Sequence, residues 1–239
     1  MAKLEAHLER IAQAALKANS TDTPSEQQQE GGSEVDDVRW WEVDLLGWEI
    51  GAEGAQLLCD WLLSRGGGGA YVEQLYLNRN KLGEDGGVRW IAQAIERHPN
   101  LKTVVLNSNA LGDDGAELII DALIRRLNGT EGKEVVPLEG LGLCDNGITE
   151  EGAVRLAERL CSEVVCWKKG EGELTLSLNH NPIGEKGAKA LQRLLKKTML
   201  ESGGEASGTP PVRVYMGHDD SKLVGLLDRQ SGALLLPAS

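Results

Sequence analysis

Two segments of the chain repeat one phrase: LNRNKLGEDGG at residues 77–87 and LNSNALGDDGA at residues 106–116. Extended by two residues at the front, the same pattern occurs in VDLLGWEIGAEGA (43–55), LGLCDNGITEEGA (141–153) and LSLNHNPIGEKGA (176–188). Self-similarity over this length is the signature of a repeat architecture. The sequence therefore predicts five copies of one structural unit.

Each position of the unit has a structural task. Apolar residues at a spacing of two, such as Leu75 and Leu77, predict a short strand with one buried face. The asparagine that follows ends the strand, and its side chain can bond the backbone of the turn and of neighbouring copies. We expect a structural ladder of Asn80, Asn109, Asn146 and Asn181. In the first copy Trp48 stands in place of asparagine.

A helix is expected after each strand. The glycines permit a tight bend and a close approach of the helix to the strand layer. Residues 112–127 then carry one apolar stripe, and acidic pairs such as Asp113 and Asp114 stand at the helix starts, where they favour the positive end of the helix dipole. One strand and one helix cannot bury both apolar faces alone, so the copies are expected to stack.

These residues resemble the leucine-rich repeats of the ribonuclease-inhibitor type, whose unit reads L-x-x-L-x-L-x-x-N-x-L, then G-x-x-G and a helix. The resemblance covers residues 38–216. It implies an α/β fold: a short solenoid of about five repeats with atypical end caps, in which a curved parallel sheet lies inside and helices lie outside. A protein partner is expected to bind through the concave sheet face and the rim loops.

The two ends depart from the repeat. We expect residues 1–37 to form a helix and a flexible acidic linker, with the helix either docked over the first repeat or reaching a partner. Residues 217–239 are expected to form a cap, as a hairpin that closes the open end or docks to a partner. Trp48 is expected to serve a cap rather than a ligand pocket. We expect a flexible loop at residues 66–69, and solvated loops at 128–137 and 161–173 that project from one rim of the solenoid; the alternative for these two is a binding role.

Composition excludes several classes of protein. The net charge of −12 argues against nucleic acid or an anionic membrane as partner and is compatible with a basic protein surface. No apolar run reaches the roughly 20 residues that a membrane span needs, and the N-terminus lacks a signal peptide. The four cysteines (Cys59, Cys144, Cys161 and Cys166) are scattered, so we expect no metal site, reduced thiols and a cytoplasmic location.

No catalytic motif is found. The chain contains no phosphate-binding G-x-x-x-x-G-K-[ST] and no G-x-S-x-G elbow, and His7, His98, His180 and His218 lack metal-ligand spacing. We therefore expect no catalytic residue, no cofactor and no small-molecule substrate.

The residues between and after the core leucines are expected to form rows across the concave face. One row is Asp44, Tyr76, Val105, Gly142, Ser177 and Arg213; the next is Asn78, Asn107, Cys144, Asn179 and Tyr215; a third is Arg79, Ser108, Asp145 and His180. Aromatic residues and arginine are common interface anchors. The predicted partner-binding residues are Asp44, Tyr76, Arg79, Asn107, Asp145, Asn179, His180, Arg213 and Tyr215. The alternative is a solvated sheet face.

The sequence thus predicts a non-catalytic scaffold or adaptor, a subunit of a larger cytoplasmic, cytoskeletal or ciliary assembly. The resemblance leaves two alternatives open: a GTPase-activating protein resembling the Ran activator, and an actin pointed-end capping module resembling that of tropomodulin-like proteins.

Overall fold

The computed structural model describes residues 1–20, 41–64, 67–128, 136–163, 174–201 and 212–216. The expected acidic linker, the loops at 128–137 and 161–173 and the C-terminal hairpin lie wholly or largely outside these ranges. The strands are β1 (Glu42–Asp44), β2 (Gln74–Tyr76), β3 (Thr103–Val105), β4 (Gly140–Gly142), β5 (Leu174–Ser177) and β6 (Val212–Tyr215). The helices are α1 (Ala2–Ser20), α2 (Gly51–Leu62), η1 (Gly68–Tyr71, a 3-10 helix), α3 (Val88–Arg97), α4 (Gly112–Leu127), α5 (Glu150–Glu163) and α6 (Gly184–Glu201).

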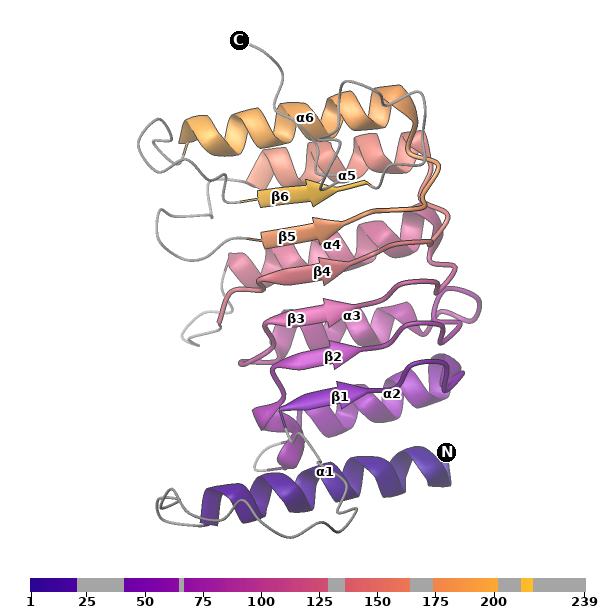
Figure 1. The fold of residues 1–239 in the computed structure, drawn as a ribbon, viewed down its shortest axis with the longest axis vertical. Helices are drawn as coiled ribbons and strands as arrows, with labels where there is room; N and C mark the ends of the chain where they lie inside the picture. Colours follow the sequence, from indigo (N-terminus) through magenta and orange to yellow (C-terminus); the bar gives the residue numbers. More distant parts are fainter. Residues whose placement is uncertain (21–40, 65–66, 129–135, 164–173, 202–211, 217–239) are drawn as a thin grey trace, which may run out of the picture.

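The strands form one six-stranded parallel sheet in the order β1-β2-β3-β4-β5-β6, and helices α2 to α6 form a second layer on one face of it (Figure 1). The register follows the repeat, since Leu75 pairs with Val104, Val104 with Leu141 and Leu141 with Leu176. This arrangement confirms the predicted short leucine-rich-repeat solenoid. The sheet face that points away from the helices is called the open face below.

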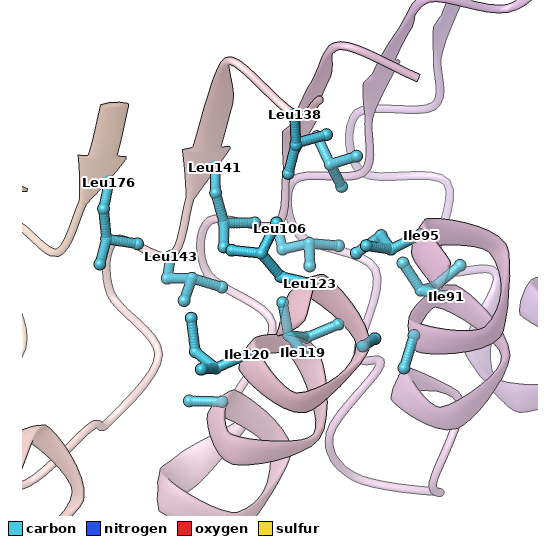
Figure 2. Close-up of a cluster of buried hydrophobic side chains, with 14 of the residues drawn as sticks. Ile91, Ile95, Leu106, Ile119, Ile120, Leu123, Leu138, Leu141, Leu143 and Leu176 are labelled. Carbon is cyan, nitrogen blue, oxygen red and sulfur yellow. The ribbon is translucent and has the colours of Figure 1, made fainter. Parts of the chain in front are cut away.

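The core lies between the two layers and is aliphatic, as a chain without phenylalanine requires. Figure 2 shows Leu141, Leu143 and Leu176 pointing from the strand layer toward the α4 residues Ile119, Ile120 and Leu123. All six side chains are at most 1% exposed. Because each repeat supplies leucine and isoleucine at the same places, each copy covers the core of its neighbour.

Helix α1 packs over the first repeat. Its apolar face is formed by Leu4, Leu8, Ile11 and Ala15, each at most 4% exposed. Leu4, Leu8 and Ile11 belong to the main hydrophobic core. A Cβ added to Gly68 would lie 2.2 Å from the Ala12 Cα, so glycine is needed for this approach. The expectation of a flexible loop at 66–69 is therefore wrong for Gly68 and Gly69, which are buried against α1 and α2 respectively.

Trp48 takes part in the same cap. Its ring lies 4.9 Å from the His7 ring, and the Lys3 ammonium lies 4.3 Å from its centroid. Both contacts come from α1. The tryptophan thus meets α1 at the position where the later repeats place asparagine.

The acidic residues at the helix starts reach across to the neighbouring repeat. An Asp85 oxygen accepts a hydrogen bond from the Ala52 N–H at 2.8 Å, and Asp113 Oδ1 accepts one from the Thr149 N–H at 2.7 Å. In the last pair, Glu150 Oε2 accepts from the Lys186 N–H at 3.0 Å. These carboxylates satisfy free amides at helix N-termini, so they fix one repeat to the next.

A buried polar network joins α3 and α4 at the side of the sheet where the strands begin. The guanidinium of Arg126, 3% exposed, donates to the carbonyls of Ile95 (2.8 Å), Leu101 (2.9 Å) and Val136 (2.6 Å). Burial lowers the pKa of Arg126 to about 10, so the group stays charged at neutral pH. Its charge is compensated by backbone oxygens that would otherwise be unpaired.

His98 lies in the same network with 0% exposure. Its Nδ1 accepts from the Asn100 N–H at 3.2 Å, so Nε2 carries the proton and donates to the Gly69 carbonyl at 2.8 Å. Burial lowers the pKa of His98 to about 4, and the charge of Arg126 acts in the same direction. The imidazole is therefore neutral in the fold.

This neutral histidine predicts acid sensitivity. Below pH 6.5, the ordinary pKa of a histidine side chain, His98 is protonated in the unfolded chain. In the folded chain it stays neutral down to about pH 4. The contribution of neutral His98 to the free energy of unfolding is thus fully present above pH 6.5. It is lost as the pH falls toward 4, by about 3 kcal/mol. We expect His98→Gln to lose less stability than the wild type between neutral and acidic pH in denaturant unfolding. Equal losses in both proteins would contradict the assignment.

Candidate functional site: the open face of the sheet

The asparagines after the strands form a hydrogen-bonded ladder along one edge of the sheet. Asn109 Oδ1 accepts from the Asn80 N–H at 2.8 Å, and Asn109 Nδ2 donates to the Leu77 carbonyl at 2.8 Å. The same contact recurs from Asn146 to the Asn109 N–H (3.0 Å) and from Asn181 to the Asn146 N–H (2.9 Å). Each side chain thus bonds the preceding repeat, which holds the ends of the strands in line.

A second asparagine row does similar work on the open face. Asn78 Oδ1 accepts from the Asn107 N–H at 2.9 Å, and Asn107 Oδ1 accepts from the Cys144 N–H at 2.9 Å. The carbonyl oxygen of Asn107, predicted to bind a partner, is therefore used within the fold. The equivalent oxygen of Asn179 is buried and has no hydrogen-bond partner among the described residues. The recurrence of asparagine at one offset in three copies was the signal for this second role.

The register of β6 corrects the predicted rows. Arg213 pairs with Thr175, and Tyr215 pairs with Ser177. The expected placement of Arg213 beside Ser177, and of Tyr215 in the following row, is therefore wrong. The reason is that β5 starts with an extra buried residue, Leu174, which pairs with Val212.

The third predicted row lies in the turn after the strands. Arg79, Ser108, Asp145 and His180 have φ values of 58°, 56°, 53° and 60°. This left-handed conformation is costly for residues other than glycine, yet every repeat requires it at this point. Ser108 donates to Asp145 at 2.8 Å. The row is thus built by the repeat turn, which aligns these side chains along the edge of the open face.

The corrected row gives the open face a central strip, defined as Tyr76, Val105, Gly142, Ser177 and Tyr215. Both tyrosines are half-buried, and the Tyr76 hydroxyl donates to Gln74 at 2.9 Å. Val105, Gly142 and Ser177 lie between the two tyrosines. Residue 142 has to be glycine, because a Cβ there would lie 2.8 Å from a Val105 methyl. Asp44 continues the strip onto β1.

Leu46 is a further residue of the open face, and it is absent from the set predicted from sequence. It lies two residues after the end of β1 and is 54% exposed. With Tyr76 and Val105 on the neighbouring strands, it makes the β1–β3 end of the face more apolar than the predicted set suggested.

The described residues offer little for chemistry. They contain no group of three or more His, Cys, Asp or Glu side chains placed to hold a metal ion. Burial raises the pKa of the Cys59 thiol to about 11 and also raises that of Cys144, so both thiols are protonated and unreactive at neutral pH. None of the helices in the described ranges is long and apolar enough to cross a membrane.

The family model that matches the chain agrees with this architecture. A family model described as "Leucine Rich repeat" matches residues 97–119 and 174–191. Together with the parallel sheet, these matches show that the chain contains leucine-rich repeats. Among solved structures, it is similar to one titled "Leiomodin-1 Actin-Binding Site 2 (ABS2)", with 20% identity and a TM-score of 0.34 over 46% of this chain and 56% of that one. No curated protein sequence matches the chain.

Proposed function

We propose that the chain is a non-catalytic scaffold or adaptor of the ribonuclease-inhibitor type, which binds a protein partner across the central strip. The observation that carries this proposal is the strip itself: two tyrosines in register on β2 and β6, with small side chains on the strands between them. Tyrosine is an amphipathic anchor that contributes strongly to interfaces. Repeat solenoids use such extended faces for binding.

The dimensions of the strip suit one partner element. Tyr76 and Tyr215 stand on strands four positions apart, which at about 4.8 Å per strand is roughly 19 Å. A partner helix of about 13 residues would span that distance. Because the two asparagine rows bond the backbone of successive repeats, the strip is held rigid, and binding would order few side chains.

Charge supports a partner with a basic surface. Asp44 and Asp145 are exposed at the margins of the strip, and the chain carries a net charge of −12. Opposite charge speeds encounter and favours some partners over others. We further propose that the partner belongs to a cytoplasmic or cytoskeletal assembly.

Affinity recovery with matched variants tests the proposal. Proteins retained by the wild type from native lysate are compared with those retained by the Tyr76→Ala/Tyr215→Ala variant and by Leu118→Ala, which changes an exposed residue of α4. We expect a partner that the double variant loses by more than about tenfold and that Leu118→Ala retains. The same proteins bound by all three, or lost only with Leu118→Ala, would contradict the strip.

Two activity assays separate this proposal from the alternatives that the resemblance left open. A Ran-type GTPase would hydrolyse GTP faster in the presence of a GTPase-activating protein, and actin pointed ends would elongate more slowly in the presence of a capping module. We expect no change in either rate. Faster GTP hydrolysis would contradict the proposed scaffold function and favour a GTPase-activating protein.

A further inference from the structure

Helix α6 carries a basic stripe on an acidic protein. The stripe, defined as Lys186, Lys189, Arg193 and Lys196, follows helical spacing, and all four residues are exposed. The Lys186 and Lys189 side chains are 81% and 58% exposed, with ion pairs to Glu150 (3.4 Å) and Glu185 (2.5 Å). The chain as a whole carries a net charge of −12. Such a stripe is therefore an unusual local surface for this protein.

The repeat shows which direction the stripe faces. Aligning Gly112 with Gly184 makes three α4 carboxylates, Asp114, Glu117 and Asp121, the equivalents of Lys186, Lys189 and Arg193. Those carboxylates face the next helix of the stack. Arg155 of α5 contacts Asp114 at 3.1 Å and Glu117 at 3.2 Å, and Arg159 contacts Asp121 at 2.6 Å.

The sign of the charge is thus reversed where a following unit would stand. No helix follows α6 within the described residues. At the same alignment the buried α4 residues Ile120 and Ile124 correspond to Gln192, which is polar and only 6% exposed, and to Lys196, which is exposed. The surface is therefore not built to continue the hydrophobic core. It is suited to a polar, negatively charged occupant.

We propose that this basic stripe binds the acidic segment 21–37 of a second copy of the chain. That segment holds six acidic residues and no lysine or arginine: Asp22, Glu26, Glu30, Glu34, Asp36 and Asp37. The match is one of charge, between the acidic stretch and four exposed basic side chains. The inference does not depend on the central strip, because the stripe lies in the helix layer.

Length and position place the contact between two molecules. The segment is attached to α1 and β1, at the opposite end of the stack from α6 (Figure 1). Five strand spacings separate β1 from β6, about 24 Å, and α1 lies farther out still. The 20 residues from 21 to 40 span at most about 70 Å when fully extended. An excursion to α6 and back takes more than about 48 Å of this length and leaves few residues to contact the stripe, so the segment of a second molecule is the better occupant, in a head-to-tail contact.

Sedimentation of the full chain at low salt tests the contact. We expect the weight-average mass of the wild type to rise with concentration and to return to the monomer value at high salt. The Lys189→Glu/Arg193→Glu variant is expected to stay monomeric, and a synthetic peptide of residues 21–37 to dissociate the wild type. The Arg89→Glu/Arg97→Glu control makes the same change of charge on α3 and should associate within about twofold of the wild type.

A charge exchange distinguishes the contact from general attraction. The Glu26→Lys/Glu30→Lys/Glu34→Lys variant should also be monomeric, and mixing it with Lys189→Glu/Arg193→Glu should restore association. Thermal melts check that every variant is folded. A wild type that stays monomeric at low salt would overturn the proposal. So would association that the α6 variant does not weaken, or that the α3 control weakens as much.

Discussion

Replacing Arg126 with methionine is expected to lower the free energy of unfolding by about 3–5 kcal/mol. Methionine fills part of the space but donates no hydrogen bond. The buried carbonyls of Ile95 and Leu101 and the part-buried carbonyl of Val136 would lose their guanidinium donor. The loss should be large because a buried carbonyl without a donor costs its full desolvation free energy. That cost exceeds the net stabilisation of an ordinary hydrogen bond.

The matched control is Arg125→Met, one residue earlier in the same helix. Arg125 is 51% exposed and makes a single ion pair, to Glu96 at 2.7 Å. Its loss should cost less than about 1 kcal/mol. Denaturant unfolding followed by circular dichroism measures both variants. Similar losses for the two would show that the carbonyl network is not what Arg126 contributes.

Replacing Asn109 with alanine is expected to cost about 3 kcal/mol. The side chain bonds the preceding repeat twice, because it accepts from the Asn80 N–H and donates to the Leu77 carbonyl at 2.8 Å each. It also donates to the Leu106 carbonyl at 2.9 Å. All these groups are buried, so water cannot replace the lost bonds.

Asn78→Ala supplies the comparison for the ladder. Asn78 is half-buried, and its oxygen accepts the Asn107 N–H at 2.9 Å. Water can reach the amide at this part-buried position, so the expected loss is about 1 kcal/mol. A loss for Asn78→Ala as large as that for Asn109→Ala, in the same unfolding experiment, would contradict the ranking of the two rows.

Much of the fold could be predicted because each repeat has the same type of residue, apolar or polar, at the same position of the unit. Leu75, Val104, Leu141 and Leu176 share one strand position, and parallel pairing then follows. The copy at 74–97 is less regular, since its helix begins at Val88 rather than at the first glycine. A Cβ at Gly83 would lie 2.0 Å from the Ala110 carbonyl oxygen, so this glycine packs against the next turn.

The rest depended on contacts that the periodicity does not encode. Arg126 reads as a helix surface residue in sequence, and its burial arises from carbonyls of the preceding helix and of residue 136. The register of β6 depended on Leu174, which precedes the repeated phrase. On the open face, the presence of an asparagine in the sequence does not show whether its side chain bonds the backbone or is available to a partner.

Site-specific photo-crosslinking tests the binding face most directly. A photoreactive phenylalanine analogue is placed at position 76 on the central strip, or at position 118 on exposed α4, and each protein is irradiated in native lysate. If the open face binds the partner, position 76 will yield a discrete covalent adduct that position 118 does not. Adducts formed from position 118 alone would place binding on the helix layer and contradict the proposed function.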